Sequence, residues 1–247
     1  MERAGFRRAN TSSWQPLGRA LVEGGNEDEL TVVYEDGSLD ALPLTELRRL
    51  EGLNESDQVA MALSAGRVLD VGCGAGPHLR ELHDRGIARR DLVGLDLSLG
   101  AVISARSNGR FPVVCGTRSA FAVGTFDTVL LLMNGLGLAG DLRGVLPFLR
   151  SLRDLLRPGG QILIESTHLE CRPTPEQKRL LELRRQGGRH AGESRQQLIW
   201  RDAVGDVFRW IYLGPQDLAA LAGEVDLAAH VLFEDGHGTY LTRLIAA

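Results

Sequence analysis

The feature that most constrains the fold is the ten-residue stretch 68–77, "VLDVGCGAGP". An apolar run interrupted by one aspartate leads into three glycines at alternate positions, Gly72, Gly74 and Gly76. Glycine accepts positive φ angles and lets a ligand approach the main chain. The stretch therefore predicts a buried strand that ends in a sharp turn, with a helix beginning directly after it.

Short apolar runs, each bounded by turn residues, recur along the following hundred residues and predict buried strands. Their apolar residues run on without alternation, as expected for parallel strands covered on both faces. The predicted strands are 67–71, 92–97, 112–115, 126–133 and 160–165, and the predicted helices between them are 78–85, 98–107 and 142–156. Strand alternating with helix predicts a Rossmann-like, doubly wound α/β fold with a mostly parallel sheet.

The end of the chain predicts a change of strand direction. Residues 215–221 are typical of a helix, and 228–233 and 239–245 flank the turn "EDGHG". Two strands joined in this way form an antiparallel hairpin. We therefore expect a seven-stranded sheet with an antiparallel C-terminal strand.

Two segments stand outside the alternating pattern. Residues 1–55 form an N-terminal extension, a candidate lid, ahead of a main domain that spans 56–247. Within the main domain, about 170–213 is an insert with a predicted β-hairpin that carries Trp200 and Trp210. Such additions to a core usually form binding loops.

Composition excludes several classes of protein. A formal net charge of −4 gives no basic footprint for DNA. The three cysteines show no CxxC spacing and the six histidines no metal-ligand spacing, so neither disulfides nor a metal is expected. No apolar run approaches the ~20 residues of a membrane span, and the first ten residues lack the apolar core of a signal peptide. We therefore expect a cytoplasmic protein without a membrane partner; its oligomeric state is left open.

The glycine spacing indicates which kind of ligand the turn accepts. The chain lacks the dinucleotide fingerprint G-x-G-x-x-G, because its glycines fall at 72, 74 and 76 and Pro77 stands where the third glycine of the fingerprint would be. It also lacks the Gly-Lys-Ser/Thr of a phosphate-binding loop. Asp96, twenty residues beyond Gly76, ends the second predicted strand, where a carboxylate can accept both hydroxyls of a ribose. The sequence therefore favours an adenosine compound without a pyrophosphate.

Four motifs in order, "VLDVGCGAG", "LVGLDLS", "FDTVLLLMNGLG" and "LRPGGQILIEST", resemble those of class I S-adenosylmethionine-dependent methyltransferases. The resemblance runs from about residue 67 to residue 167. It implies an enzyme with the cofactor S-adenosyl-L-methionine. It also implies a set of cofactor-binding residues: Asp70, Gly72, Gly74 and Gly76 around the methionine part, Asp96 on the ribose, Leu97 against the adenine, and the backbone around Asn134 facing the transferred methyl group.

One position departs from the family pattern. Many members carry an acidic residue after the third strand that recognises the adenine amino group, whereas this chain has Gly116-Thr117-Arg118. Thr117 can still accept one hydrogen bond. We assign it to the adenine on that basis.

Several of these residues also allow a purely structural interpretation. Asp70 can brace the first helix, and 134–137 can be a flexible loop. Cys73 fits a small filler, because no activating partner for a catalytic thiol is evident. Trp200 and Trp210 serve either hairpin packing or an aromatic substrate wall. His168 follows the fifth strand and is the one candidate general base, but the catalytic residues are left unassigned.

The class of methyl acceptor is predicted from a sequence motif that is absent at the end of the fourth predicted strand. Residues 133–136 are not the Asn/Asp-Pro-Pro-aromatic tetrapeptide of amino-methylating nucleic-acid enzymes, and the net charge is negative. We therefore expect a small-molecule acceptor in a pocket formed by the extension and the insert, and no DNA. The alternatives are a protein or RNA methyltransferase that uses the basic residues of the insert, and a non-catalytic cofactor-binding protein.

Overall fold

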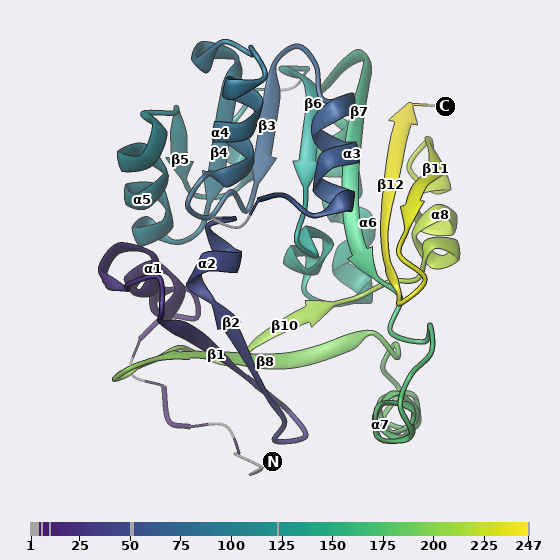
Figure 1. Ribbon diagram of the computed structural model, residues 1–247. Coiled ribbons are helices and arrows are strands. Elements are labelled where there is room, and N and C mark those ends of the chain that lie inside the picture. The colour runs from purple at the N-terminus through teal and green to yellow at the C-terminus, as the bar shows by residue number, and fades with distance from the viewer. Residues whose placement is uncertain (1–4, 6, 10, 50–51, 123, 247) are drawn as a thin grey trace. The chain divides into compact units, whose positions relative to one another are not determined.

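The computed structural model describes all residues of the chain except 1–4, 6, 10, 50–51, 123 and 247. The described strands form two sheets (Figure 1). The five-stranded sheet contains β1 (Glu29–Tyr34), β2 (Leu39–Pro43), β8 (Glu193–Trp200), β9 (Ala203–Val204) and β10 (Phe208–Ile211). The seven-stranded sheet contains β3 (Val68–Val71), β4 (Leu92–Asp96), β5 (Val113–Cys115), β6 (Phe126–Leu131), β7 (Leu156–Thr167), β11 (Leu227–Glu234) and β12 (Thr239–Ala246).

Helix α1 precedes the first described strand, and the other helices lie between strands along the chain. The α-helices are α1 (Gln15–Glu23), α2 (Leu44–Leu47), α3 (Glu55–Leu63), α4 (Pro77–Asp84), α5 (Leu99–Gly109), α6 (Leu142–Arg153), α7 (Pro175–Gln186) and α8 (Pro215–Gly223). Three short 3₁₀ segments are η1 (Arg89–Asp91), η2 (Arg118–Ala120) and η3 (Gly135–Ala139). Among the described residues, none of the helices combines the length and apolar character that crossing a membrane requires.

The seven-stranded sheet confirms the predicted Rossmann-like fold. Its strand order is β11-β12-β7-β6-β3-β4-β5. The pairs β3–β6, β6–β7 and β4–β5 are parallel, whereas β12 runs antiparallel to both β7 and β11. Counted along the chain, the five parallel strands stand in the order 3-2-1-4-5, which is that of a doubly wound sheet.

The largest differences from the predicted strand boundaries are in β6 and β7. Strand β6 ends at Leu131 rather than at 133, because Met133 and Asn134 have φ angles of 53° and 61°, which a strand cannot contain. Strand β7 begins at Leu156, before the predicted break at 157–160. Pairing with β6 shifts register between Leu156 and Gln161, so the proline and glycines of that segment form an irregularity within the strand.

By packing, the chain divides into two compact units. Unit 1 consists of Met1–Leu53, Gly72–Ala120 and Arg195–Phe208. Unit 2 consists of Asn54–Val71, Phe121–Ser194 and Arg209–Ala247. Each unit thus assembles segments that are far apart in the sequence.

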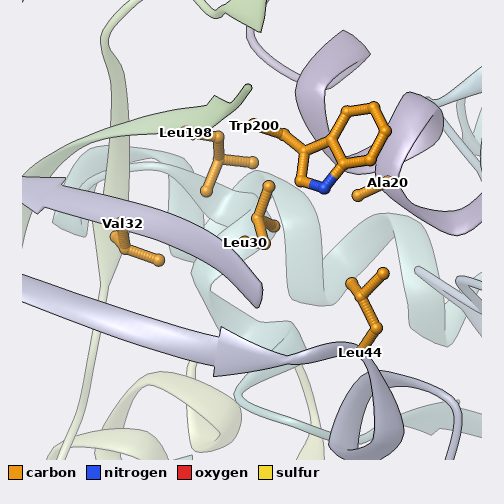
Figure 2. Packing of buried hydrophobic residues seen from close by; sticks show 6 residues of the cluster. All are labelled: Ala20, Leu30, Val32, Leu44, Leu198 and Trp200. Carbon is orange, nitrogen blue, oxygen red and sulfur yellow. The ribbon is translucent and has the colours of Figure 1, made fainter. Parts of the chain in front are cut away.

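In unit 1 the N-terminal extension and the insert share one sheet, which the sequence did not predict. Strand β1 pairs antiparallel with β2 on one side and with β8 on the other, Thr31 lying opposite Ile199. One face of this sheet packs against α1 (Figure 2). The buried cluster there consists of Ala20, Leu30, Val32, Leu44, Leu198 and Trp200. The extension is therefore built into the fold.

A buried side-chain amide on β8 binds the backbone of Arg7 and of Gly205. Gln197 Nε2 donates to Arg7 O at 2.8 Å and to Gly205 O at 2.9 Å, and its Oε1 accepts from Arg7 N at 2.8 Å. We expect Gln197→Ala to lower the free energy of unfolding by about 2–4 kcal/mol, since buried backbone groups lose their partners. Urea unfolding measures this change. The exposed variant Gln186→Ala is expected to stay within about 0.5 kcal/mol, and equal midpoints for the two variants would contradict the prediction.

In unit 2 the strands β3, β6, β7, β12 and β11 lie side by side (Figure 1). The buried Tyr240 on β12 donates its hydroxyl to Leu213 O at 2.8 Å. Burial raises the pKa of this hydroxyl well above its usual value. The C-terminal hairpin is thereby tied to the segment that leads into α8.

Candidate functional site

The glycine turn between β3 and α4 has the backbone that its sequence predicts. Gly72, Gly74 and Gly76 have φ angles of 79°, 52° and 77°. The turn is fixed to the neighbouring β4, because Gly72 N and Cys73 N donate to Leu95 O at 2.7 and 3.2 Å. A positive φ angle is unfavourable for residues that carry a Cβ atom. The three positions with positive φ in this turn are therefore glycines.

Two of these glycines serve different purposes. A Cβ added to Gly76 would lie 3.3 Å from the Cβ of Ala105, so this glycine allows α4 and α5 to pack closely. A Cβ added to Gly74 would meet nothing within 4 Å. Gly74 therefore borders open space, where a ligand can approach the main chain. Cys73 packs its sulfur against Gly94 and acts as a filler, as the structural interpretation expects.

The carboxylate of Asp96, at the end of β4, stabilises the glycine turn by accepting backbone hydrogen bonds. Its Oδ2 accepts from Gly74 N at 2.9 Å and its Oδ1 accepts from Ser98 N at 2.8 Å. The residue is 8% exposed. Both oxygens face backbone donors, so an asparagine would turn its NH₂ group toward an N–H. A carboxylate can accept several hydrogen bonds at once, and a ribose diol offers two donors.

Two further residues of unit 1 were predicted to bind the cofactor, Leu97 and Thr117, and they lie just after the ends of β4 and β5. Leu97 is 45% exposed, directly after Asp96. Gly116 N donates to Asp96 O at 2.9 Å, which brings the ends of β4 and β5 together. Thr117 is exposed, and its Oγ1 lies 2.8 Å from Ser119 Oγ. Gly72, Gly74, Gly76, Asp96, Leu97 and Thr117 thus belong to one connected region.

Helix α1 packs on this region through a glycine–glycine crossing. A Cβ on Gly100 would lie 2.4 Å from the carbonyl of Gly18, and a Cβ on Gly18 would lie 2.3 Å from Ser98 Oγ. Leu21 of the same helix packs against Ala75 in the glycine turn and against Ala101. Sequence reasoning missed this contact. The sequence signal for this contact is a glycine inside each of the two helices. Glycine destabilises a helix, so its presence there indicates that another backbone packs closely against it.

Asp70 and Asn134 lie in unit 2. Asp70 is buried in β3, two residues before the glycine turn begins. Asn134 follows β6 in a left-handed conformation, and its Oδ1 accepts from Thr167 Oγ1 at 2.9 Å. Left-handed residues other than glycine are strained and cluster at functional sites. The ends of β6 and β7 are joined by this hydrogen bond.

The return strand of the insert packs onto the turn that follows Asn134. A Cβ on Gly137 would lie 1.9 Å from Cε2 of Trp210, so the indole occupies the space beside this glycine. Arg209 Nη1 lies 2.6 Å from Asp141 Oδ2 at the start of α6, and this hydrogen bond lowers the pKa of the Asp141 carboxyl. Packing of the Trp210 indole against the turn after Asn134 is therefore observed.

His168 lies directly after β7, as predicted. Its backbone N donates to Gly238 O at 2.8 Å, and a Cβ on Gly214 would lie 2.9 Å from its Cδ2. The imidazole therefore packs against the residue that precedes α8. Its role as a general base stays a prediction. Among the described residues no group of three or more His, Cys, Asp or Glu side chains is arranged to hold a metal ion.

The protein is a Rossmann-like α/β protein, as shown by its strand order, its glycine turn and the aspartate that ends β4. In proteins of this class, ligands bind at the carboxyl ends of the parallel strands. A family model described as "Methyltransferase domain" matches residues 68–160. This range contains the glycine turn, Asp96 and Asn134.

Solved structures and a curated relative agree with that match. The S-adenosylmethionine-dependent methyltransferase of Bacteroides fragilis, solved in complex with S-adenosyl-L-homocysteine, is 29% identical, has a TM-score of 0.81, and the alignment covers 97% of this chain and 98% of that one. The CcbJ methyltransferase of Streptomyces caelestis shares the fold, with 16% identity, a TM-score of 0.58 and coverage of 80% and 92%. The tRNA U34 carboxymethyltransferase of Idiomarina loihiensis is 31% identical over 118 residues, 44% of this chain and 35% of that protein.

The chain therefore contains a match to a methyltransferase domain and resembles the class I S-adenosylmethionine-dependent family in fold and in its sequence motifs. The cofactor of this family is S-adenosylmethionine. The match to the curated relative spans about a third of that relative's length.

Proposed function

We propose that the protein transfers a methyl group from S-adenosylmethionine to a small-molecule acceptor. The observation that carries the cofactor part is the carboxylate of Asp96, held by Gly74 N and Ser98 N beside a main chain that borders open space. The cofactor supplies a methyl group already activated by a sulfonium. The protein's contribution is then mainly alignment and exclusion of water.

The cofactor-binding residues are proposed in the roles that the resemblance implies. The region fits an adenosine compound, because Asp96 places a carboxylate at the end of β4, Leu97 offers an exposed apolar face, and Gly74 leaves room for the methionine part. Thr117 is proposed for the adenine. Asp70 and the backbone around Asn134 complete the set.

The small-molecule acceptor is supported by the way the insert folds back. Strand β10 places Trp210 on Gly137 and Arg209 on Asp141, so the turn after Asn134 is covered by part of the insert. A covered turn suits a small acceptor better than a large polymer, since binding sites for small molecules are concave and enclosed. The extension 1–55 and the insert at about 170–213 are proposed as the parts that form the acceptor pocket.

An RNA acceptor is the second candidate, favoured by the name of the tRNA U34 carboxymethyltransferase of Idiomarina loihiensis. Helix α7 exposes basic residues that suit a phosphate backbone, including Lys178, Arg179 and Arg185. Arg185 is, however, paired with Glu170 and Glu182. This pairing reduces the positive field that binding to RNA requires.

Calorimetric titration with S-adenosylhomocysteine tests the cofactor proposal. The wild-type protein is expected to bind one equivalent, and Gly74→Ala to bind about tenfold or more weakly, because a methyl group there enters the ligand's space. Gly188→Ala is the matched control: its φ is 72° and its Cβ also meets nothing within 4 Å, but it follows α7. Equal affinity of Gly74→Ala and wild type would refute the assignment.

Turnover distinguishes the two acceptors. Formation of S-adenosylhomocysteine is measured with a low-molecular-mass cell extract and, separately, with total tRNA. We expect turnover with the former. Turnover with tRNA alone, falling steeply as salt increases, would establish RNA as the acceptor instead.

A further inference from the structure

Trp210 differs from the other tryptophan of the insert in its surroundings. Trp200 is 2% exposed and belongs to the buried cluster (Figure 2). The guanidinium carbons of Arg19 and Arg201 lie 5.5 and 4.1 Å from the centroid of its ring. Trp210, one residue before the end of β10, is only half-buried. Core packing accounts for Trp200, whereas Trp210 as a whole residue stays partly exposed.

The indole of Trp210 lies within one turn of the backbone that is proposed to face the methyl group. Gly137 N donates to Asn134 O at 2.9 Å. A Cβ on Gly137 would stand 1.9, 2.1 and 2.3 Å from Cε2, Nε1 and Cδ2 of Trp210, so the ring covers the Cα of that glycine. Residue 137 must therefore lack a side chain for the indole to reach this position.

The strand that carries the indole is fixed at both ends. Arg209 pairs with Asp141, whose Oδ1 accepts from Gly144 N at 3.1 Å and caps α6. At the other end, Tyr212 N, directly after β10, donates to Gly192 O at 3.0 Å. An aromatic ring held in this way is preorganised, which lowers the entropy lost when a ligand stacks on it.

We infer that the indole of Trp210 forms a wall of the acceptor site and selects acceptors that present a flat unsaturated ring. This inference rests on the proposed function, because it takes the Asn134 backbone as the place of methyl transfer. Flat rings stack on an indole face, and saturated rings of the same size do not share that geometry. A phenol and a nucleobase both offer such a ring, and the experiment separates them.

The test uses protein labelled with 5-fluorotryptophan and saturated with S-adenosylhomocysteine. Its ¹⁹F resonances are assigned with Trp210→Phe, and the probes are catechol, uridine and the saturated control cyclohexane-1,2-diol. We expect catechol or uridine to shift the Trp210 resonance saturably and the diol to leave it in place. The probe that acts shows whether a phenol-type or a nucleobase-type ring is preferred.

Gly137→Ala supplies the decisive variant, because its methyl group displaces the indole. We expect it to weaken probe binding about fivefold or more, the usual contribution of one aromatic stack. Gly223→Ala, whose Cβ meets nothing within 4 Å, is the matched control and should behave as wild type. No shift with either flat probe, an equal shift with the diol, or unchanged binding in Gly137→Ala would overturn the inference. Calorimetry with S-adenosylhomocysteine on the same samples reports the proposed function separately.

Discussion

Asp96→Ala is expected to weaken the binding of S-adenosylhomocysteine by about 100-fold or more, measured by calorimetry. The carboxylate is proposed to accept both ribose hydroxyls, and hydrogen bonds to a charged group contribute about 1.5–3 kcal/mol each. The substitution also removes the acceptors for Gly74 N and Ser98 N, so the turn that borders the ligand is loosened. Asp96→Asn is expected to lose about tenfold, because its NH₂ group must face one of these two donors.

Asp235→Ala is the matched control for this prediction. Its carboxylate also accepts backbone N–H groups, from His237, Gly238 and Thr239, but in the turn between β11 and β12. Asp235→Ala therefore shows how much affinity for S-adenosylhomocysteine is lost when a carboxylate of this kind is removed at a place far from the glycine turn in the sequence. We expect its affinity for S-adenosylhomocysteine to remain within about twofold of wild type. An Asp96→Ala protein that binds as tightly as this control would remove Asp96 from the site.

Gly100→Ala is expected to destabilise the protein by about 3 kcal/mol, with a fall in Tm of roughly 6–12 °C. A glycine-to-alanine change inside a helix ordinarily gains stability, so the sign itself is diagnostic. Here the new Cβ would lie 2.4 Å from the backbone of Gly18, which cannot rotate away. Because α1 also packs Leu21 against Ala75, the affinity for S-adenosylhomocysteine is expected to fall as well.

Differential scanning calorimetry measures the change in Tm, and hydrogen exchange of α1 locates it. The control is again Gly223→Ala, a helical glycine at the end of α8 with open space around it, which is expected to be neutral or mildly stabilising. If Gly100→Ala raised Tm as this control does, the α1–α5 crossing would not be tight in solution.

The central architecture could be predicted because it depends on short-range patterns. Unbroken apolar runs, the serine that caps α5 and the turn before β12 each indicate a local structure, and strands that alternate with helices indicate a parallel sheet with right-handed connections. The glycine turn was equally evident, since no other residue type tolerates three alternate left-handed positions. The boundary of β6 was missed because the conformation of Met133 and Asn134 is imposed by their surroundings and not by propensity.

The sequence by itself determined the Rossmann-like sheet, its antiparallel C-terminal hairpin and the pairing of a glycine turn with an acidic strand end. Only the tertiary structure decided that β1 pairs with β8, that Gly18 and Gly100 let two helices cross, and that the Trp210 indole covers Gly137. These contacts join residues that are tens to well over a hundred positions apart. They depend on how the shapes of two surfaces match once both have formed, and periodicity along one segment carries no information about that match.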